Sequence, residues 1–200
     1  MSPPDQRPAR PVEPLDELAG WGPVATPAGS FRLEPVRPKR DLALLGEWMN
    51  DPAVDAFWGL AGPLERTAGQ LRRQLSGDGH SLPCLGLLDD RPMSYWEIYR
   101  ADLDPLARYY PALDHDLGVH LLIGRPRDRG RGLGSVLLRG VAELALRRVP
   151  GCQRVVAEPD IRNHASVAAF RAAGFRQTAE LELPDKRAAL LVRGRGPASP

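Results

Sequence analysis

The stretch Arg125–Ser135, RPRDRGRGLGS, repeats arginine at every second position from 125 to 131 and carries glycine at positions 130, 132 and 134. The residues that follow, GSVLLRGVAELALRR over 134–148, have apolar side chains at helical spacing, which predicts a helix beginning at this loop. Glycines before a helix leave backbone N–H groups accessible, and the helix dipole adds partial positive charge at the same place. Because glycine has no β-carbon, a ligand can also approach the backbone closely. The stretch therefore predicts an anion cradle.

Other interpretations of this loop are weaker. It is not a Walker phosphate loop, because no Gly-Lys-Ser/Thr sequence follows. It is a poor dinucleotide fingerprint, since five residues separate it from the preceding strand and no acidic residue follows about 20 positions on. A solvated arginine–glycine turn stays open as an alternative. An RNA-binding segment is disfavoured, because Leu133 and the helix behind it imply ordered chain.

Apolar periodicity along the rest of the chain alternates between strand and helix. Helices are expected over 40–51, 63–76, 134–148 and 163–175. Strands are expected over 31–36, 82–88, 93–100, 116–124 and 154–159, and in the stretches FRQTAELEL and KRAALLVRG. This order of elements predicts an α/β fold with a mixed, strongly bent central sheet.

Composition and charge limit the classes of protein. The 200 residues are 42% hydrophobic and 26% charged, which is typical of a globular domain. A net charge of +2 is too small to imply nucleic acid or a membrane as partner. Cys84 and Cys152 have no metal-binding spacing, so reduced thiols and no metal are expected. With no leader peptide or membrane-spanning run, a cytoplasmic protein is predicted.

The ends of the chain differ from its middle. Residues 1–28 are rich in proline and charge, which predicts a disordered or loosely tethered arm. The domain is expected over 29–194, followed by a flexible tail over 195–200.

Two motifs carry a resemblance to a known family. The spacing Arg129-x-x-Gly132-x-Gly134 and the helix NHASVAAFRAAGF over 163–175 resemble the GCN5-related N-acetyltransferase (GNAT) superfamily. The resemblance implies splayed parallel strands and an acyl-coenzyme A co-substrate, acetyl- or succinyl-coenzyme A, with its pyrophosphate in the cradle. Phe170 stands where many relatives have a tyrosine that protonates the leaving thiolate. The cofactor-binding residues implied are Leu122, Ile123, Arg129, Gly130, Arg131, Gly132, Leu133, Gly134, Ser135, Asn163 and Phe170.

Three further stretches narrow the resemblance. YWEIYR over 95–100, HDLGVHLLIG over 115–124 and AEPDIRN over 157–163 look like the acyltransferases of hydroxamate siderophore pathways. Such enzymes acylate the hydroxylated nitrogen of N-hydroxylysine or of an N-hydroxydiamine such as N-hydroxycadaverine. A hydroxylamine nitrogen is far less basic than an alkylamine, so it is mostly neutral at pH 7. The partner implied is a small molecule, and the chain is expected to be a monomer or a dimer.

Candidate catalytic residues follow from this resemblance. A lone histidine such as His120 inside GVHLLIG is more often a packed core residue, and Glu158 could be a solvated strand end. In the resembled family both positions face the reaction centre, so His120 is expected to be the general base, held by Glu158 or Asp160. A backbone N–H on the strand of His120 is expected to meet the oxyanion.

Candidate substrate-binding residues lie on two other segments. In the strand over 93–100, alternation places Trp96 with Ile98 on one face and Glu97 with Tyr99 on the other. A buried Glu97 near the cleft would bind the distal ammonium of the substrate, although an ordinary core strand would show the same pattern. The substrate-binding residues expected are Trp58, Trp96, Glu97 and Tyr99.

Two other functions stay open. An aminoglycoside 6′-N-acetyltransferase shares the scaffold and an acidic strand end. A non-catalytic coenzyme A-binding domain would also keep the cradle, and Phe170 is compatible with lost chemistry.

Overall fold

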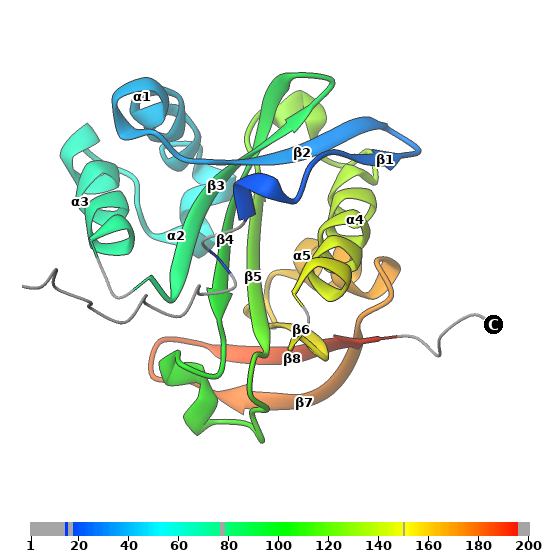
Figure 1. The fold of residues 1–200 in the computed structure, drawn as a ribbon. Helices are drawn as coiled ribbons and strands as arrows, with labels where there is room; N and C mark the ends of the chain where they lie inside the picture. Colours follow the sequence, from blue (N-terminus) through cyan, green and yellow to red (C-terminus); the bar gives the residue numbers. More distant parts are fainter. Residues whose placement is uncertain (1–14, 16–17, 77–78, 150, 196–200) are drawn as a thin grey trace, which may run out of the picture.

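The structure, a computed structural model, describes residues 15, 18–76, 79–149 and 151–195. Its centre is an eight-stranded sheet in the order β1-β2-β3-β4-β5-β6-β8-β7 (Figure 1). Neighbouring strands are antiparallel except β5 and β6, which are parallel. The predicted mixed α/β sheet is therefore confirmed.

The bounds of the elements agree closely with the apolar periodicity. The strands are β1 (Val24–Thr26), β2 (Gly29–Pro35), β3 (Ser81–Leu88), β4 (Arg91–Arg100), β5 (Leu117–Ile123), β6 (Arg154–Ala157), β7 (Arg176–Glu182) and β8 (Arg187–Gly194). The helices are α1 (Pro38–Met49), α2 (Pro52–Trp58), α3 (Leu64–Leu75), α4 (Leu133–Arg148) and α5 (His164–Ala172), with short 3-10 turns η1 (Leu18–Gly20), η2 (Pro105–Arg108) and η3 (Pro126–Asp128).

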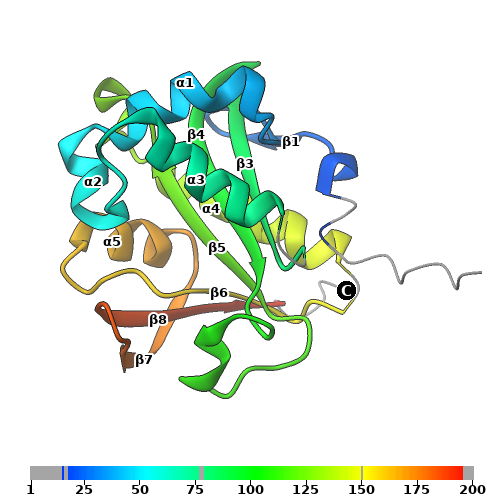
Figure 2. The same cartoon turned by 90° about the vertical axis from the view of Figure 1, so that its left-hand side faces the viewer.

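Helices cover both faces of the sheet. Figures 1 and 2 show α1, α2 and α3 on one side of strands β3–β5, and α4 with α5 on the other. The side chains of β4 divide accordingly: Tyr95 is buried in the cluster with α1 and α3, whereas Trp96 and Ile98 are buried in the cluster with α4. This alternation, inherent in a strand, leaves Glu97 on the Tyr95 face.

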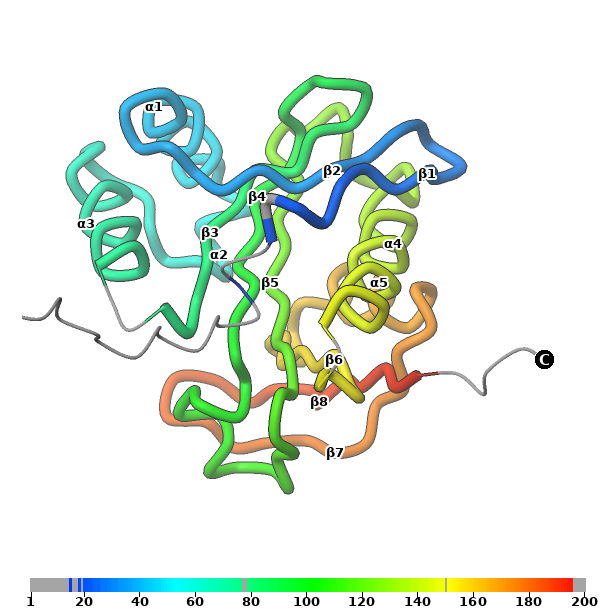
Figure 3. The backbone as a smooth tube through the Cα atoms, viewed as in Figure 1, coloured from blue at the N-terminus to red at the C-terminus, as the bar shows by residue number. Residues whose placement is uncertain are grey.

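The parallel pair β5 and β6 opens the sheet at its centre. Pairing between them is limited to Leu117 with Val155 and Gly118 with Val156. β5 then continues to Ile123 along β4, whereas β6 ends at Ala157 (Figure 3). The edge of β5 beyond Gly118 is therefore free of β6, and the expected splayed parallel strands are present.

The predicted loose arm over 1–28 is wrong in its second half. Leu15, Leu18 and Trp21 are buried in the main core, and β1 pairs with β2. These three apolar residues stand among prolines and charges and hardly change the average composition, but a few large apolar side chains suffice to anchor a segment. Residues 1–14, 16–17 and 196–200 of the predicted arm and tail lie outside the described residues.

Helix α2 was not expected from the sequence. Asp51 accepts a hydrogen bond from the backbone N–H of Ala53 and so caps the helix, while Pro52 occupies its first position. The helix ends at Gly59, which has a left-handed φ of 60°. It is short, so its apolar period was too brief to recognise. Among the helices of the described residues, none has both the length and the apolar character needed to cross a membrane.

Candidate active site

His120 lies between two carboxylates at the point where the sheet opens. Its Nδ1 is 2.9 Å from Oε2 of Glu97, and its Nε2 is 2.6 Å from Oε1 of Glu158. Glu97 is the direct cross-strand neighbour of His120 in the register of β4 and β5, and Glu158 follows the end of β6. The histidine side chain is 34% exposed, whereas both carboxylates are almost buried. The imidazole ring therefore reaches solvent, whereas the two carboxylates that contact it are buried.

Each carboxylate is fixed from behind by further donors. Glu97 accepts hydrogen bonds from Nε2 of Gln74 at 2.6 Å and from the hydroxyl of Tyr95 at 3.1 Å. Glu158 accepts one from the hydroxyl of Tyr99 at 2.6 Å, and Nζ of Lys186 lies 3.5 Å away. Such satisfied networks hold buried charges in one geometry.

The ring of Tyr99 reaches Glu158 because β5 carries glycine beneath it. A β-carbon built on Gly118 would collide with this ring, so only glycine fits at that position. Gly118 is also the cross-strand partner of Tyr99 in the β4–β5 register. The glycine in the sequence GVHLLIG thus places the hydroxyl that holds Glu158.

The two carboxylates keep His120 charged. Burial lowers the pKa of His120, but the negative charges and hydrogen bonds of Glu158 and Glu97 outweigh it and raise the pKa to about 10. Burial raises the pKa of Glu158, but His120, Lys186 and Tyr99 outweigh it and lower the pKa to about 2. The pKa of Glu97 is lowered in the same sense, against its burial, chiefly by His120. At neutral pH these shifts favour an imidazolium between two carboxylates.

Three of the expected roles gain no support from the contacts in this geometry. Asp160 does not hold His120, because its Oδ2 pairs with Nη2 of Arg162 at 2.5 Å. Glu97 lines the cavity but already contacts His120, Gln74 and Tyr95, so its expected role toward a substrate ammonium stays a prediction. Tyr99 is buried behind Glu158 and is not among the residues that line the cavity in front of it.

Trp96 is also wrongly assigned to substrate binding. Its side chain is fully buried on the opposite face of the sheet, where Nε1 donates to Oγ of Ser94 at 2.9 Å. The strand alternation that separates Trp96 from Glu97 is the physical reason. Trp58, by contrast, lines the cavity above His120, with its ring centroid 6.3 Å from that of the imidazole.

A cavity of about 570 Å³ lies in front of His120. It is bounded by α2, β5, the segment after β6 and the turn between β7 and β8. Charges of both signs line it, including Asp185 and Lys186 from that turn. The cavity has the size and mixed polarity of a small-molecule site.

A second, mostly apolar groove of about 590 Å³ joins this cavity at Trp58, Leu121 and Phe170. It runs between α2 and α5 to the glycine loop at the start of α4. Gly130 and Gly132 have φ values of 69° and 75°, and a β-carbon on either would meet no other atom within 4 Å. The open backbone of this loop fits the pyrophosphate of an acyl-coenzyme A. Ten of the expected cofactor-binding residues line the groove: Leu122, Ile123, Arg129, Gly130, Gly132, Leu133, Gly134, Ser135, Asn163 and Phe170.

Two of these residues shape the groove through contacts of their own. The guanidinium of Arg129 donates to the carbonyls of Ile123 and Gly124 and to Oδ1 of Asp51, at 2.9, 2.6 and 2.8 Å. It therefore ties the loop to β5 and to the cap of α2. Asn163 caps α5 by accepting from the backbone N–H of Ser166. Arg131, the eleventh expected residue, lines a different cavity on the other side of the loop.

Two residues of the site could not be predicted from the sequence. Gln74 comes from α3 and Lys186 from the turn before β8, and neither belongs to a recognisable motif. Alternation in β4 places Tyr95, Glu97 and Tyr99 on one face, but it does not give the register with β5 that brings Glu97 opposite His120. Among the described residues, no group of three or more His, Cys, Asp or Glu side chains is placed to hold a metal.

Splayed strands, a glycine loop at the start of a helix and a groove that ends at His120 together match the arrangement expected for the GNAT superfamily. The chain belongs to the acetyltransferase (GNAT) domain family, whose model matches residues 37–183.

Curated relatives and solved structures agree with this assignment. The chain is 36% identical over 189 residues to an N(6)-hydroxylysine O-acetyltransferase of Escherichia coli, covering 94% of this chain and 59% of that protein. It is 32% identical to the lysine N-acyltransferase MbtK of Mycobacterium sp. (strain MCS), covering 88% and 72% of the two chains. The chain thus spans less than two thirds of the length of the first relative.

Two solved structures have the same fold. An uncharacterised protein of Bacillus halodurans superimposes with a TM-score of 0.80 at 34% identity, over 87% of this chain and 91% of that one. The aminoglycoside acetyltransferase AAC(6′)-Ib, solved with coenzyme A, gives a TM-score of 0.75 at 24% identity, over 83% and 95%. The latter likeness concerns the fold alone.

Proposed function

We propose that this chain transfers an acyl group from acyl-coenzyme A to the hydroxylated nitrogen of a small N-hydroxy amine. The product is a hydroxamate, and the step belongs to the assembly of a hydroxamate siderophore. The names of similar proteins support this substrate class: N(6)-hydroxylysine O-acetyltransferase, lysine N-acyltransferase and hydroxyornithine transacylase. The buried free thiols of Cys84 and Cys152 accord with a place in the cytoplasm.

The position of His120 between Glu97 and Glu158 carries the proposal. An alkylammonium must lose a proton before it attacks, which costs about 4.6 kcal/mol at pH 7 for a pKa of about 10.4. The imidazolium of His120 cannot take that proton, because its own pKa is about 10. A hydroxylamine arrives neutral and needs no such base. The site therefore suits a nucleophile of low basicity.

The imidazolium of His120 can also donate a proton to the leaving sulfur of coenzyme A. The attacking nitrogen loses one proton when the new N–C bond forms, and the sulfur gains one when the C–S bond breaks. We assign Glu158 as the acceptor of the first proton and His120 as the donor of the second, because Phe170 has no hydroxyl for this task. A shift of the proton from Glu158 to His120 along their 2.6 Å contact restores the starting state. Backbone N–H groups on the free edge of β5 would meet the oxyanion.

The charges of the turn between β7 and β8 favour an amino acid as acceptor. Asp185 and Lys186 stand side by side in the turn between β7 and β8, and both line the cavity. The α-amino and α-carboxylate groups of N-hydroxylysine offer the matching pair of charges, whereas N-hydroxycadaverine offers only a cation. We therefore place N-hydroxylysine ahead of an N-hydroxydiamine.

The test is a panel of acceptors assayed by thiol release, with acetyl- and succinyl-coenzyme A as donors. The acceptors are N-hydroxylysine, N-hydroxycadaverine, their parent amines and kanamycin. N-Acylation gives a hydroxamate that forms a coloured ferric complex, whereas O-acylation does not, so the colour reports the acceptor atom. Equal rates on lysine and N-hydroxylysine, or preference for kanamycin, would overturn the proposal.

A further inference from the structure

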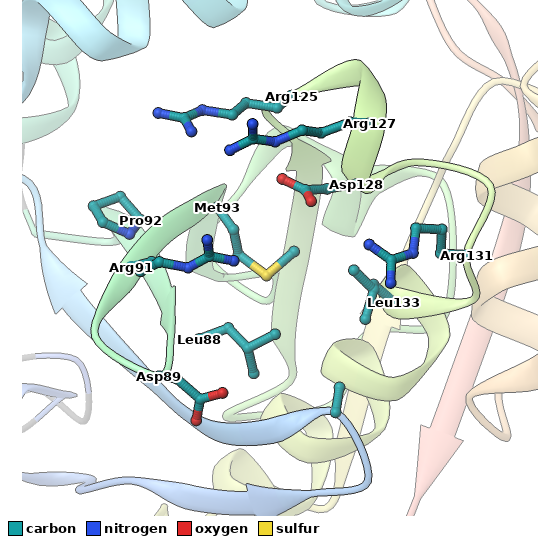
Figure 4. A pocket seen from close by; sticks show the side chains of 11 residues that line it. Leu88, Asp89, Arg91, Pro92, Met93, Arg125, Arg127, Asp128, Arg131 and Leu133 are labelled. Atoms are coloured by element: carbon teal, nitrogen blue, oxygen red, sulfur yellow. The ribbon is translucent and has the colours of Figure 1, made fainter.

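A basic cavity of about 460 Å³ lies on the side of the glycine loop away from α5. Four arginines surround it: Arg91 from the β3–β4 hairpin, and Arg125, Arg127 and Arg131 from the segment between β5 and α4. Its lining includes the apolar side chains of Leu88, Met93 and Leu133. We call these seven residues the arginine bowl. Figure 4 shows the guanidinium groups directed toward the space above Met93.

Among the residues that the structure describes, the four guanidinium groups of the bowl have no anionic partner. In the part of the chain that the structure describes, none of them lies within ion-pair distance of a carboxylate, whereas Arg129 next to them is paired with Asp51. Of the two carboxylates at the bowl, Asp89 accepts a hydrogen bond from the backbone N–H of Ser30. The excess of positive charge in a concave site attracts and retains an anion.

The bowl adjoins the groove assigned to the acyl donor. Asp128 and Leu133 line both cavities, and Arg131 lies between the two cradle glycines Gly130 and Gly132. A molecule whose pyrophosphate rests on the loop can therefore extend into the bowl without leaving the surface. Coenzyme A carries a third phosphate, on the 3′-oxygen of its adenosine ribose, a few bonds from the pyrophosphate.

We propose that the arginine bowl binds the 3′-phosphate of the acyl donor, with the adenosine resting on the apolar side chains. This inference rests on the proposed use of acyl-coenzyme A. A phosphate monoester carries close to two negative charges at neutral pH, and the planar guanidinium group binds it through two parallel N–H donors. Arg91, at the β3–β4 hairpin, lies across the cavity from the arginines that precede α4. The phosphate would therefore be bound by two segments that are distant in sequence.

Equilibrium binding of coenzyme A and of 3′-dephospho-coenzyme A, measured by calorimetry without acceptor, tests the site. The wild-type chain is expected to bind coenzyme A about tenfold tighter or more, the usual range for charge-assisted phosphate contacts. The double variant Arg91→Ala/Arg127→Ala should lose most of this preference, while its affinity for 3′-dephospho-coenzyme A changes little. Arg148→Ala, at the other end of α4 and exposed, removes the same charge and should leave the preference intact.

Two results would overturn the inference. One is equal affinity of the wild-type chain for the two ligands. The other is a loss in the double variant that is the same for both, which would indicate a general electrostatic effect rather than a 3′-phosphate site. Turnover of N-hydroxylysine with saturating acetyl-coenzyme A tests the proposed function separately, because the bowl makes no contact with His120. If the chain discriminates between the two ligands but acylates no hydroxylamine, the 3′-phosphate site is supported and the proposed function is contradicted.

Discussion

His120 and Glu97 face each other across the antiparallel strands β5 and β4, with Nδ1 of the histidine 2.9 Å from the carboxylate. Glu158 approaches the opposite nitrogen of the same ring. Histidine thereby acts as the shared cation of two buried acids, and both the charge of the site and its response to pH depend on this arrangement.

The first prediction concerns the titration of His120. Its folded-state pKa of about 10 lies above the unfolded value of about 6.5, so its contribution to stability is complete below pH 6.5. That contribution is lost as pH rises through 10. Glu97→Gln removes one acid, so the folded-state pKa of His120 should fall; the loss should still begin near pH 6.5, which the unfolded chain sets, but should end at lower pH. Nuclear magnetic resonance of the labelled imidazole measures the pKa directly, and a wild-type value near 6.5 would contradict the geometry.

The second prediction concerns the donor behind Glu158. Tyr99→Phe keeps the ring over Gly118 but removes the hydroxyl that donates to Glu158. Loss of a hydrogen bond to a buried charge should cost about 1.5–3 kcal/mol of stability and should raise the pKa of Glu158. We expect kcat per folded molecule to fall by about tenfold, the equivalent of about 1.4 kcal/mol.

The matched control for this change is Tyr110→Phe. The hydroxyl of Tyr110 also donates to a buried carboxylate, that of Asp116, at 3.0 Å and outside the catalytic cavity. It should lower the melting temperature similarly with kcat per folded molecule unchanged. If both variants lose activity equally, Tyr99 is only a structural residue.

The third prediction concerns the cradle. Gly132 has φ 75°, and alanine there should destabilise the chain by about 1–2 kcal/mol through backbone strain, although its β-carbon meets no other atom within 4 Å. That β-carbon would stand in the space assigned to the pyrophosphate, so affinity for coenzyme A should fall as well. Gly22→Ala places the same strain at φ 73° in open space, and Gly22 lines neither cavity at the loop. If calorimetry finds equal coenzyme A affinity in the two variants, the pyrophosphate does not bind at this loop.

Much of this architecture could be predicted from the sequence because its signals are local. The glycine loop, helix α4 and the apolar strand with His120 were each recognisable from neighbouring residues. The partner of His120 was not, because the β4–β5 connection over 101–116 is too long for turn geometry to fix the register that brings Glu97 opposite. Choosing between Glu158 and Asp160 was equally inaccessible, since it depends on Arg162 pairing with Asp160. The burial of Leu18 and Trp21 could not be predicted either, because the residues around them are rich in proline.

The last prediction concerns the removal of His120 itself. His120→Ala takes away the cation and leaves Glu97 and Glu158 buried with no charge between them. The pKa of these carboxyl groups should rise because like charges and burial both disfavour ionisation, so the variant should become relatively more stable as pH falls. If His120 carries the proton, kcat per folded molecule should drop by about 10²–10⁴, with coenzyme A affinity nearly unchanged, because the cradle lies elsewhere. For the wild-type enzyme, kcat should be lost as pH rises through 10, where the imidazolium gives up its proton. A packing role predicts instead that activity declines only in proportion to the folded fraction. Turnover, melting curves and coenzyme A binding measured on the same preparations separate the two, and a folded variant with wild-type kcat would leave Glu158 to act without His120.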